Sequence, residues 1–325
     1  MVRLKMAIVK DKLCVVQFMH SGNEFLMSKC KNTPPAKVCA NGSLQVPWSM
    51  EKDHFRRLVQ HDGWYVDKSG DYKKGHLVFW TEWEAMTIAW PLGTDKDFFK
   101  AHFVHEILCP PTVSGTAHCG KNPNGSYGYQ NTDPCVFGDK FKYSNCHQSE
   151  RGDLRRMKPG SLVVFGSYKE DKQRGKEEFC LDTIFVVGDV AYDYSTNNVD
   201  AVQCSEWYKN LTLRRLPPGK SFTFYRGTTC RQKVNLANAL FSFTPAKIYD
   251  GVYVPRERCV LDDIRSLNSH LRTAVFNRGR QGFHPEEANR NEIKAVWDDI
   301  VQQVMKQGFV LGVRFDGWTQ QTTRD

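Results

Sequence analysis

Apolar residues recur along the chain with two spacings, one typical of strands and the other typical of helices. Continuous runs of β-branched and aromatic residues that end at Gly, Pro or polar residues favour buried strands. Such runs occupy residues 12–19, 63–67, 76–90, 161–167, 177–190 and 221–227. The polar residues 169–176 separate two of these runs and indicate the tip of a hairpin. The sequence therefore predicts strands along much of the chain.

Helical spacing of apolar residues is found between the predicted strands. A helix is predicted at residues 50–61, because Phe55, Leu58 and Val59 fall on one face of it. A shorter helix is predicted at residues 96–107. The body of the protein is thus expected to be β-rich with helices inserted.

The last part of the chain carries two longer stripes of apolar residues at helical spacing. They comprise Val260, Ile264, Leu267, Leu271 and Val275, and Ile293, Val296, Ile300, Val301 and Val304. Pro285 is expected to open the second helix and Gly308 to end it, and residues 309–315 predict a final strand. The pattern as a whole predicts an α+β protein. Its body, residues 1–255, is expected to be mixed and β-barrel-like, and residues 256–325 are expected to form a mostly helical C-terminal region that packs on this body.

Charge adds a possible partner to this picture. The chain has a net charge of +9, and residues 200–280 alone contain 14 Lys and Arg against 6 Asp and Glu, a net charge of +8. A basic segment of this kind suits a polyanion, because lysine and arginine displace the counterions of phosphate groups. The candidate nucleic-acid-binding residues are Arg214, Arg215, Lys220, Arg226, Arg231 and Lys233.

The distribution of cysteine and of apolar runs predicts the compartment. No run of apolar residues reaches the length of about 18 that a membrane-spanning helix requires. Asp11 and Lys12 interrupt any signal-peptide core, so the 11 cysteines are expected to be reduced thiols in a cytoplasmic protein. No C-x-x-C pair is present, so no metal site is predicted, and the sequence indicates no particular cofactor.

Acid–base catalysis is suggested by His20 and Glu24, which follow the first predicted strand, and by Glu82 and Glu84, two residues apart on another. Alternate residues of a strand share a face, and neighbouring carboxylates can take the roles of acid and base. With Asp133 these residues form the candidate catalytic set. Signatures of serine hydrolases and of phosphate-binding loops are absent from the sequence.

A polar and aromatic stretch at residues 129–148 suggests a binding loop. Asp133, Asn145 and Gln148 could read the edge of a base through hydrogen bonds, and Tyr143 could stack on its face. Metal ligation and a cysteine nucleophile are the poorer explanations of this stretch.

Residues 154–190 contain a Pro-Gly turn, an apolar strand, a small turn and a second strand that ends in Val-Gly-Asp. This layout resembles the central strands of PUA-like domains, among them the EVE and YTH groups that bind modified bases. It is also similar to uncharacterised nucleotide-modification-associated domains of phage and bacteria. The resemblance implies a pocket between the strand pair and the preceding loop, and Asp139, Ser167 and Asp182 complete the candidate ligand-binding set.

The leading hypothesis is a nucleic-acid-associated protein that recognises or processes a modified base or nucleotide, in phage DNA modification or in defence against phage. Its expected partners are DNA, RNA or a nucleotide. Two alternatives stay open. The first is a glycosidase or hydrolase that acts on a nucleotide or nucleic acid through His and Glu or Asp. The second is a non-catalytic module for protein interaction.

Overall fold

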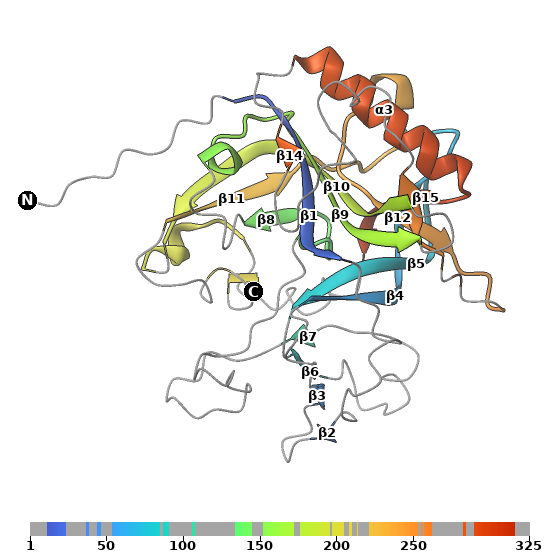
Figure 1. The fold of residues 1–325 in the computed structure, drawn as a ribbon, viewed down its shortest axis with the longest axis horizontal. Helices are drawn as coiled ribbons and strands as arrows, with labels where there is room; N and C mark the ends of the chain where they lie inside the picture. The colour runs from blue at the N-terminus through green and yellow to red at the C-terminus, as the bar shows by residue number, and fades with distance from the viewer. Residues whose placement is uncertain are drawn as a thin grey trace, which may run out of the picture.

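The computed structural model gives the fold over most of the predicted strands and over the end of the chain (Figure 1). It describes residues 12–23, 37–38, 44–46, 54–84, 87–90, 106–107, 134–144, 152–171, 176–195, 197–204, 208–209, 213, 221–252, 255, 257–261, 282–283 and 289–315. Within these ranges only the backbone is described at 19–23, 37–38, 44–46, 54–59, 82–84, 87–90, 106–107, 152–153, 168–171, 176–177 and 282–283.

A seven-stranded sheet forms the larger part of the described structure, with strand order β14-β1-β9-β10-β11-β8 and with β13 paired to β10. β1 and β9 are parallel, whereas the other pairs are antiparallel. The strands are β1 (Val15–Asn23), β8 (Lys142–Ser144), β9 (Leu162–Asp171), β10 (Lys176–Tyr194), β11 (Phe222–Gly227), β13 (Cys259–Leu261) and β14 (Gly282–Phe283).

Four antiparallel strands close a small barrel in the order β12-β15-β4-β5. They are β4 (His54–Val66), β5 (Tyr72–Glu84), β12 (Thr244–Ile248) and β15 (Val310–Phe315). A further sheet has the order β2-β3-β6-β7. Its strands are β2 (Lys37–Val38), β3 (Leu44–Val46), β6 (Thr87–Trp90) and β7 (Glu106–Ile107). Short 3-10 turns are η3 (Gly152–Arg155), η4 (Val199–Ala201) and η6 (Leu236–Asn238).

Apart from two helical residues at 208–209, the part of the chain that the structure describes contains one α-helix, α3 (Arg290–Lys306). Asn289 caps its first turn, because the Asn289 side chain accepts from the Glu292 N–H and the Glu292 carboxylate accepts from the Asn289 N–H. The helix ends before Gly308, which has a φ of 74°. Figure 1 shows α3 on the side of the molecule that carries β12 and β15.

The buried face of α3 packs against the second of two hydrophobic clusters. Trp297 is fully buried there, its ring packs edge-on to Phe241, and its Nε1 donates to the Phe241 carbonyl at 3.0 Å. Gln307, directly after α3, makes two hydrogen bonds with the backbone of Val260. Its Oε1 accepts from the Val260 N–H at 3.0 Å, and its Nε2 donates to the Val260 carbonyl at 2.7 Å. The helix is thus fixed to β13 as well as to the core.

The barrel and the large sheet share their interior. Phe79 and Phe315 of the barrel belong to the same cluster of buried hydrophobic residues as Phe18 of β1 and Phe165 of β9. Ile184 of β10 and Phe243 exchange backbone hydrogen bonds of 2.8 and 2.9 Å, which join the long strand of the sheet to the chain that enters β12. These two structures are therefore parts of one packed body.

The predicted fold class is wrong in its helical part. The described residues are mostly in strands, with α3 as their one helix of more than two residues, and a mostly helical C-terminal region is not found. Val260 lies in β13, because Cys259–Leu261 pair with residues 179–181 of β10. The rest of the first predicted stripe lies outside the described residues. Residues beyond 256 instead supply β13, β14 and β15 to the sheet and the barrel.

The predicted helix at residues 50–61 is also wrong, since residues from His54 onward belong to β4. β4 pairs with β5 along its whole length, from His54 opposite Glu84 to Val66 opposite Tyr72. This long-range pairing decides the conformation over the local apolar spacing. The short helix predicted at 96–107 is wrong at its last two residues, which form β7. The other residues of this prediction lie outside the described ranges.

Most of the other predictions for secondary structure are confirmed. The strands at 161–167, 177–190 and 221–227 are found as β9, β10 and β11, and the last helix and strand are found as α3 and β15. Gly160, with a φ of 92°, makes the turn before β9. The first strand runs further than predicted, so that His20 lies within β1 and not in a turn after it.

No helix in the described part of the chain is long and apolar enough to cross a membrane.

Candidate anion-binding site

The turn between β4 and β5 is built around the carboxylate of Asp67. One oxygen of this carboxylate accepts from the N–H of Ser69 at 2.8 Å and from the N–H of Asp71 at 3.1 Å. An aspartate at the start of a turn commonly satisfies the following N–H groups in this way. Gly70 adopts a φ of 77°, a conformation that glycine takes without strain. The sequence Asp-Lys-Ser-Gly-Asp therefore folds into a fixed turn.

The turn docks closely on the segment before η6. Val234 N–H donates to the carbonyl of Gly70 at 2.9 Å. A Cβ atom at Gly70 would lie only 2.0 Å from the Val234 carbonyl oxygen. Glycine is thus required here both for its backbone conformation and for the close approach of the two chains.

An open depression of about 430 Å³ lies where the turn meets this segment. It is lined by Lys68, Ser69, Lys233, Val234, Asn235 and Leu236. The Asn235 side-chain oxygen accepts from the N–H of Ala237 at 3.1 Å, which leaves its amide nitrogen as a donor. Two ammonium groups, a hydroxyl and an amide therefore border one hollow.

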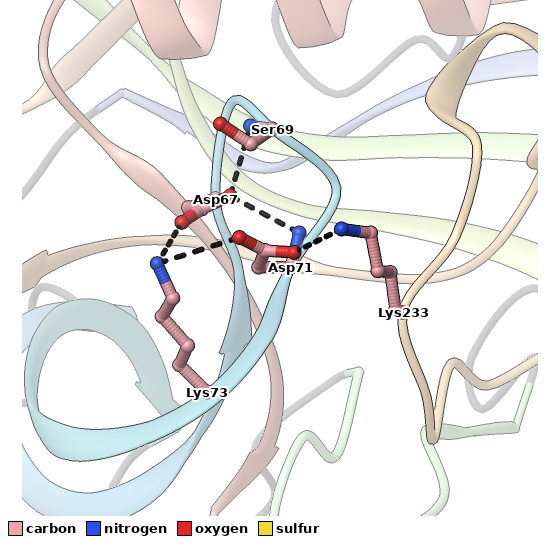
Figure 2. Close-up of polar contacts among 5 residues, drawn as sticks. All are labelled: Asp67, Ser69, Asp71, Lys73 and Lys233. Atoms are coloured by element: carbon pink, nitrogen blue, oxygen red, sulfur yellow. Dashed lines mark hydrogen bonds and ion pairs between the residues drawn. The ribbon is translucent and has the colours of Figure 1, made fainter.

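Two carboxylates hold the lysines around the turn in place, as Figure 2 shows. Lys73 lies 2.5 Å from Asp67 and 3.8 Å from Asp71, and Lys233 lies 2.7 Å from the other oxygen of Asp71. These pairs link Lys233, from a distant part of the chain, to the hairpin. The pairs are exposed, so that each contributes little to stability, but together they fix the positions of the charges.

The protonation states follow from these contacts. Partial burial alone would raise the pKa of the Asp67 carboxyl, but the hydrogen bonds from Lys73 and from two backbone N–H groups outweigh it and hold that pKa below the usual 3.8. The hydrogen bond to Asp67 raises the pKa of Lys73, and the hydrogen bond to Asp71 raises the pKa of Lys233. At neutral pH all three groups are therefore charged.

Asp67 gives a test of this turn. Asp67→Ala is expected to lower the free energy of unfolding by about 1 kcal/mol at neutral pH, because two backbone N–H groups lose their acceptor. Asp67→Asn keeps an acceptor oxygen and should cost less. Because the folded pKa of Asp67 lies below 3.8, its charge stabilises the fold above that pH, and this contribution is lost as the pH falls through the folded pKa.

Urea unfolding between pH 7 and pH 3 measures both effects. The difference between wild type and Asp67→Asn should shrink toward the acid end of this range. A difference that stays constant with pH would contradict the assigned pKa direction.

Of the predicted nucleic-acid-binding residues, the structure brings Lys233 to the depression. Arg231, two residues earlier, forms an ion pair with Asp139, a predicted ligand-binding residue. Arg226 lies on β11 and donates to the carbonyl of Gln203 at 2.6 Å. These three basic residues therefore contact three different parts of the chain.

Two predicted ligand-binding residues, Ser167 and Asp182, do come together, around Arg258. Arg258 Nη2 lies 2.6 Å from the Asp182 carboxylate and 3.4 Å from the Ser167 hydroxyl. The Arg258 and Asp182 side chains are 6 % and 5 % exposed. The guanidinium also lies over the ring of Trp80 in β5, 5.5 Å from its centroid. This buried cluster links the sheet to the barrel.

Tyr143, predicted as a stacking face, is fully buried in β8. Its ring packs against Phe18, Phe165 and Phe185, with centroids 5.1–6.0 Å apart. It is therefore part of the aromatic core, and no face of its ring is open to a base in this structure.

The remaining predicted site residues are described in their backbone alone or lie outside the described ranges. Of His20, Glu82 and Glu84 the structure describes the backbone only, in β1 and β5. Outside the described residues lie Glu24, Asp133, Asn145, Gln148, Arg214, Arg215 and Lys220. The acid–base set and the base-reading set therefore stay predictions.

The depression also contains Lys68, Ser69 and Asn235, which are not among the predicted site residues. A signal for the turn was present, because Asp67 and Gly70 are typical turn residues. Nothing in the sequence indicated that this turn docks on residues 233–236.

Thiol and metal chemistry find no support among the described residues. Burial raises the pKa of Cys259 to about 12 and also raises that of Cys230, so neither thiol is activated as a nucleophile. The described cysteines are thiols and not half-cystines. Within the described ranges, no group of three or more His, Cys, Asp or Glu is arranged to hold a metal ion.

Comparison of the chain with family models, curated proteins and solved structures found no match. The resemblance to PUA-like domains therefore stays a prediction from the sequence. What the described residues define is a β-protein with a lysine-lined depression.

Proposed function

We propose that the protein binds nucleic acid and that the depression at the β4–β5 turn contacts the phosphate backbone. The observation that carries this proposal is the polar part of the lining: two lysines, of which Lys233 also pairs with Asp71, together with a serine and an asparagine. Ammonium, hydroxyl and amide groups are the side-chain donors that commonly contact phosphate oxygens. The +8 charge of residues 200–280, which include Lys233, supports the same partner.

Recognition of a modified base or nucleotide is the finer part of this proposal. It rests on the likeness of residues 154–190 to PUA-like strand pairs and on the polar loop at 129–148. The depression itself supplies charge and hydrogen-bond donors but neither an aromatic ring nor an acid–base pair. It therefore favours binding over catalysis, and the hydrolase alternative gains no support from its residues.

Fluorescence anisotropy with labelled oligonucleotides tests the proposal. The wild-type protein should bind single-stranded or duplex DNA or RNA at low salt, with log Kd rising linearly with log salt concentration. The double variant Lys68→Gln/Lys233→Gln should bind about tenfold or more weakly at low salt, with a salt slope reduced by about 1 to 2.

A matched control is available on α3. Arg290 and Lys306 are exposed at its two ends, so Arg290→Gln/Lys306→Gln removes the same charge away from the depression. This control should keep most of the wild-type affinity. Equal losses in the two double variants would show only an effect of net charge. The proposed function fails if wild type binds none of the four nucleic-acid forms at low salt.

A further inference from the structure

The depression at the β4–β5 turn has an apolar side as well as a charged one. Val234 and Leu236 line it together with Lys68 and Lys233. Both apolar residues are half-buried and pack against the second hydrophobic cluster, so that part of their surface stays exposed. The volume of about 430 Å³ lies in the range of about 300–1,000 Å³ that is typical of sites for small molecules. The hollow therefore has room for a group that carries an apolar ring beside its phosphate.

The segment that carries these apolar residues is held in place at two points. Val234 N–H donates to the Gly70 carbonyl at 2.9 Å, and Lys294 Nζ of α3 donates to the Leu236 carbonyl at 3.3 Å. Asn235 lies between these two contacts and caps η6 with its side chain. The lining is thus fixed before a ligand arrives, which lowers the entropy that binding costs.

The side chain of Asn235 offers a ligand its donor and not its acceptor. Its Oδ1 accepts from the Ala237 N–H at 3.1 Å, so that the carbonyl oxygen is turned toward the backbone and the two N–H bonds of the amide nitrogen are left for a ligand. Guanine carries two neighbouring acceptors, N7 and O6, on one edge, whereas adenine and cytosine carry an amino group there. An asparagine that reads adenine uses its oxygen as well as its nitrogen. The amide of Asn235 therefore suits guanine better than adenine.

We propose that the depression binds one unpaired nucleotide of a single-stranded nucleic acid, with guanine preferred over adenine. Lys68 and Lys233 contact the phosphate. The base lies on Val234 and Leu236 and accepts hydrogen bonds from Asn235. A paired base would first have to leave the stack of a duplex, and this costs free energy. This inference rests on the proposed function, because it names the form of nucleic acid that the same site takes.

Fluorescence anisotropy with the full-length protein, a labelled single strand of adenine and cytosine, and the duplex of that strand tests the form of the ligand. The single strand should bind about fivefold or more tightly, because only its bases reach the apolar side of the depression. Charge alone would favour the duplex, in which phosphates are denser. Leu236→Ala should weaken binding of the single strand and leave that of the duplex unchanged. Leu240→Ala, at a half-buried residue that packs on the same cluster outside the depression, should change neither.

A second pair of single strands tests the preference for guanine. The two strands differ by one central guanine in place of adenine, and wild type should bind the guanine strand about threefold or more tightly. Asn235→Asp keeps an oxygen to cap η6 but replaces the donor by an acceptor, so that the ratio of the two affinities should fall to about 1 or below. Asn238→Asp makes the same change of charge at an exposed residue of η6 outside the depression and should keep the ratio of wild type.

The outcomes separate this inference from the proposed function. Equal affinity for single strand and duplex, with both weakened by Lys68→Gln/Lys233→Gln, would overturn the inference and leave the proposed function standing, whereas binding of no form would overturn both. A guanine preference that persists in Asn235→Asp also overturns the inference. Guanosine 5′-monophosphate should displace the labelled strand only at far higher concentration than the unlabelled strand does. Displacement at the same concentration would assign the site to free nucleotides and overturn the single-strand ligand.

Discussion

Replacing Arg258 by methionine is expected to lower the free energy of unfolding by about 3–5 kcal/mol, because it leaves the Asp182 carboxylate buried without its cation. The two side chains are 6 % and 5 % exposed and lie 2.6 Å apart, so water cannot take the place of the guanidinium. Urea unfolding at neutral pH measures the loss.

A double variant distinguishes removal of the whole Arg258–Asp182 ion pair from removal of one of its partners. Arg258→Met/Asp182→Leu removes both charges and should recover most of the stability, because a buried ion pair and an apolar pair of similar volume are often equally stable. Arg290→Met, at an exposed arginine, should change the free energy of unfolding by less than about 0.5 kcal/mol. A loss below about 1 kcal/mol in Arg258→Met would mean that the pair is more open to solvent than the structure indicates.

Trp297→Ala is the other substitution with a large expected effect. We expect it to cost about 3–5 kcal/mol, because the ring is fully buried between α3 and the sheet and its removal leaves a cavity. Trp297→Phe should cost less, since most of the ring volume stays while the hydrogen bond to the Phe241 carbonyl is lost. Gln302→Ala, on the exposed face of the same helix, should be nearly neutral.

Denaturant unfolding followed by fluorescence and by circular dichroism checks these values and shows whether α3 unfolds with the sheet. If α3 were a separately unfolding element, Trp297→Ala would produce two non-coincident transitions instead of one shifted transition. That outcome would contradict the view that helix, sheet and barrel share one core.

The parts of the fold that the sequence predicts well are those whose local pattern and long-range partners agree. β9 and β10 are runs of apolar residues bounded by turn residues, and they pair with each other as a hairpin. α3 has an apolar stripe and a glycine after its end, and these two local signals agree, whereas its start at Arg290, after the cap Asn289, was not predicted. Such agreement is what makes an element predictable.

β4 shows the opposite case. The positions of Phe55, Leu58 and Val59 fit a helix, but β4 is the central partner of β5 and β15 in the barrel. A pairing of this kind joins residues that are far apart in the chain, as Val66 of β4 is joined to Leu311 of β15. A single sequence contains no local record of it, so the helical spacing was misleading.

The candidate site was predictable only in its separate pieces. The turn at Asp67 and Gly70 has a typical composition, and the basic character of the segment around Lys233 is plain from the charge count. Their meeting depends on the hydrogen bond between Gly70 and Val234, which no spacing in the sequence indicates. Ser167 and Asp182 were selected from neighbouring strands and do lie together, but with Arg258, whose role no sequence pattern suggested.

The side-chain amide of Gln307 also affects how this protein meets other chains. β13 is a short strand with β10 on one side, and its other side would ordinarily offer an unpaired N–H and carbonyl at Val260. Gln307 occupies both groups, as a neighbouring strand would. A strand from another molecule would have to break both hydrogen bonds before adding here, so Gln307, directly after α3, protects this edge against self-association into extended sheets.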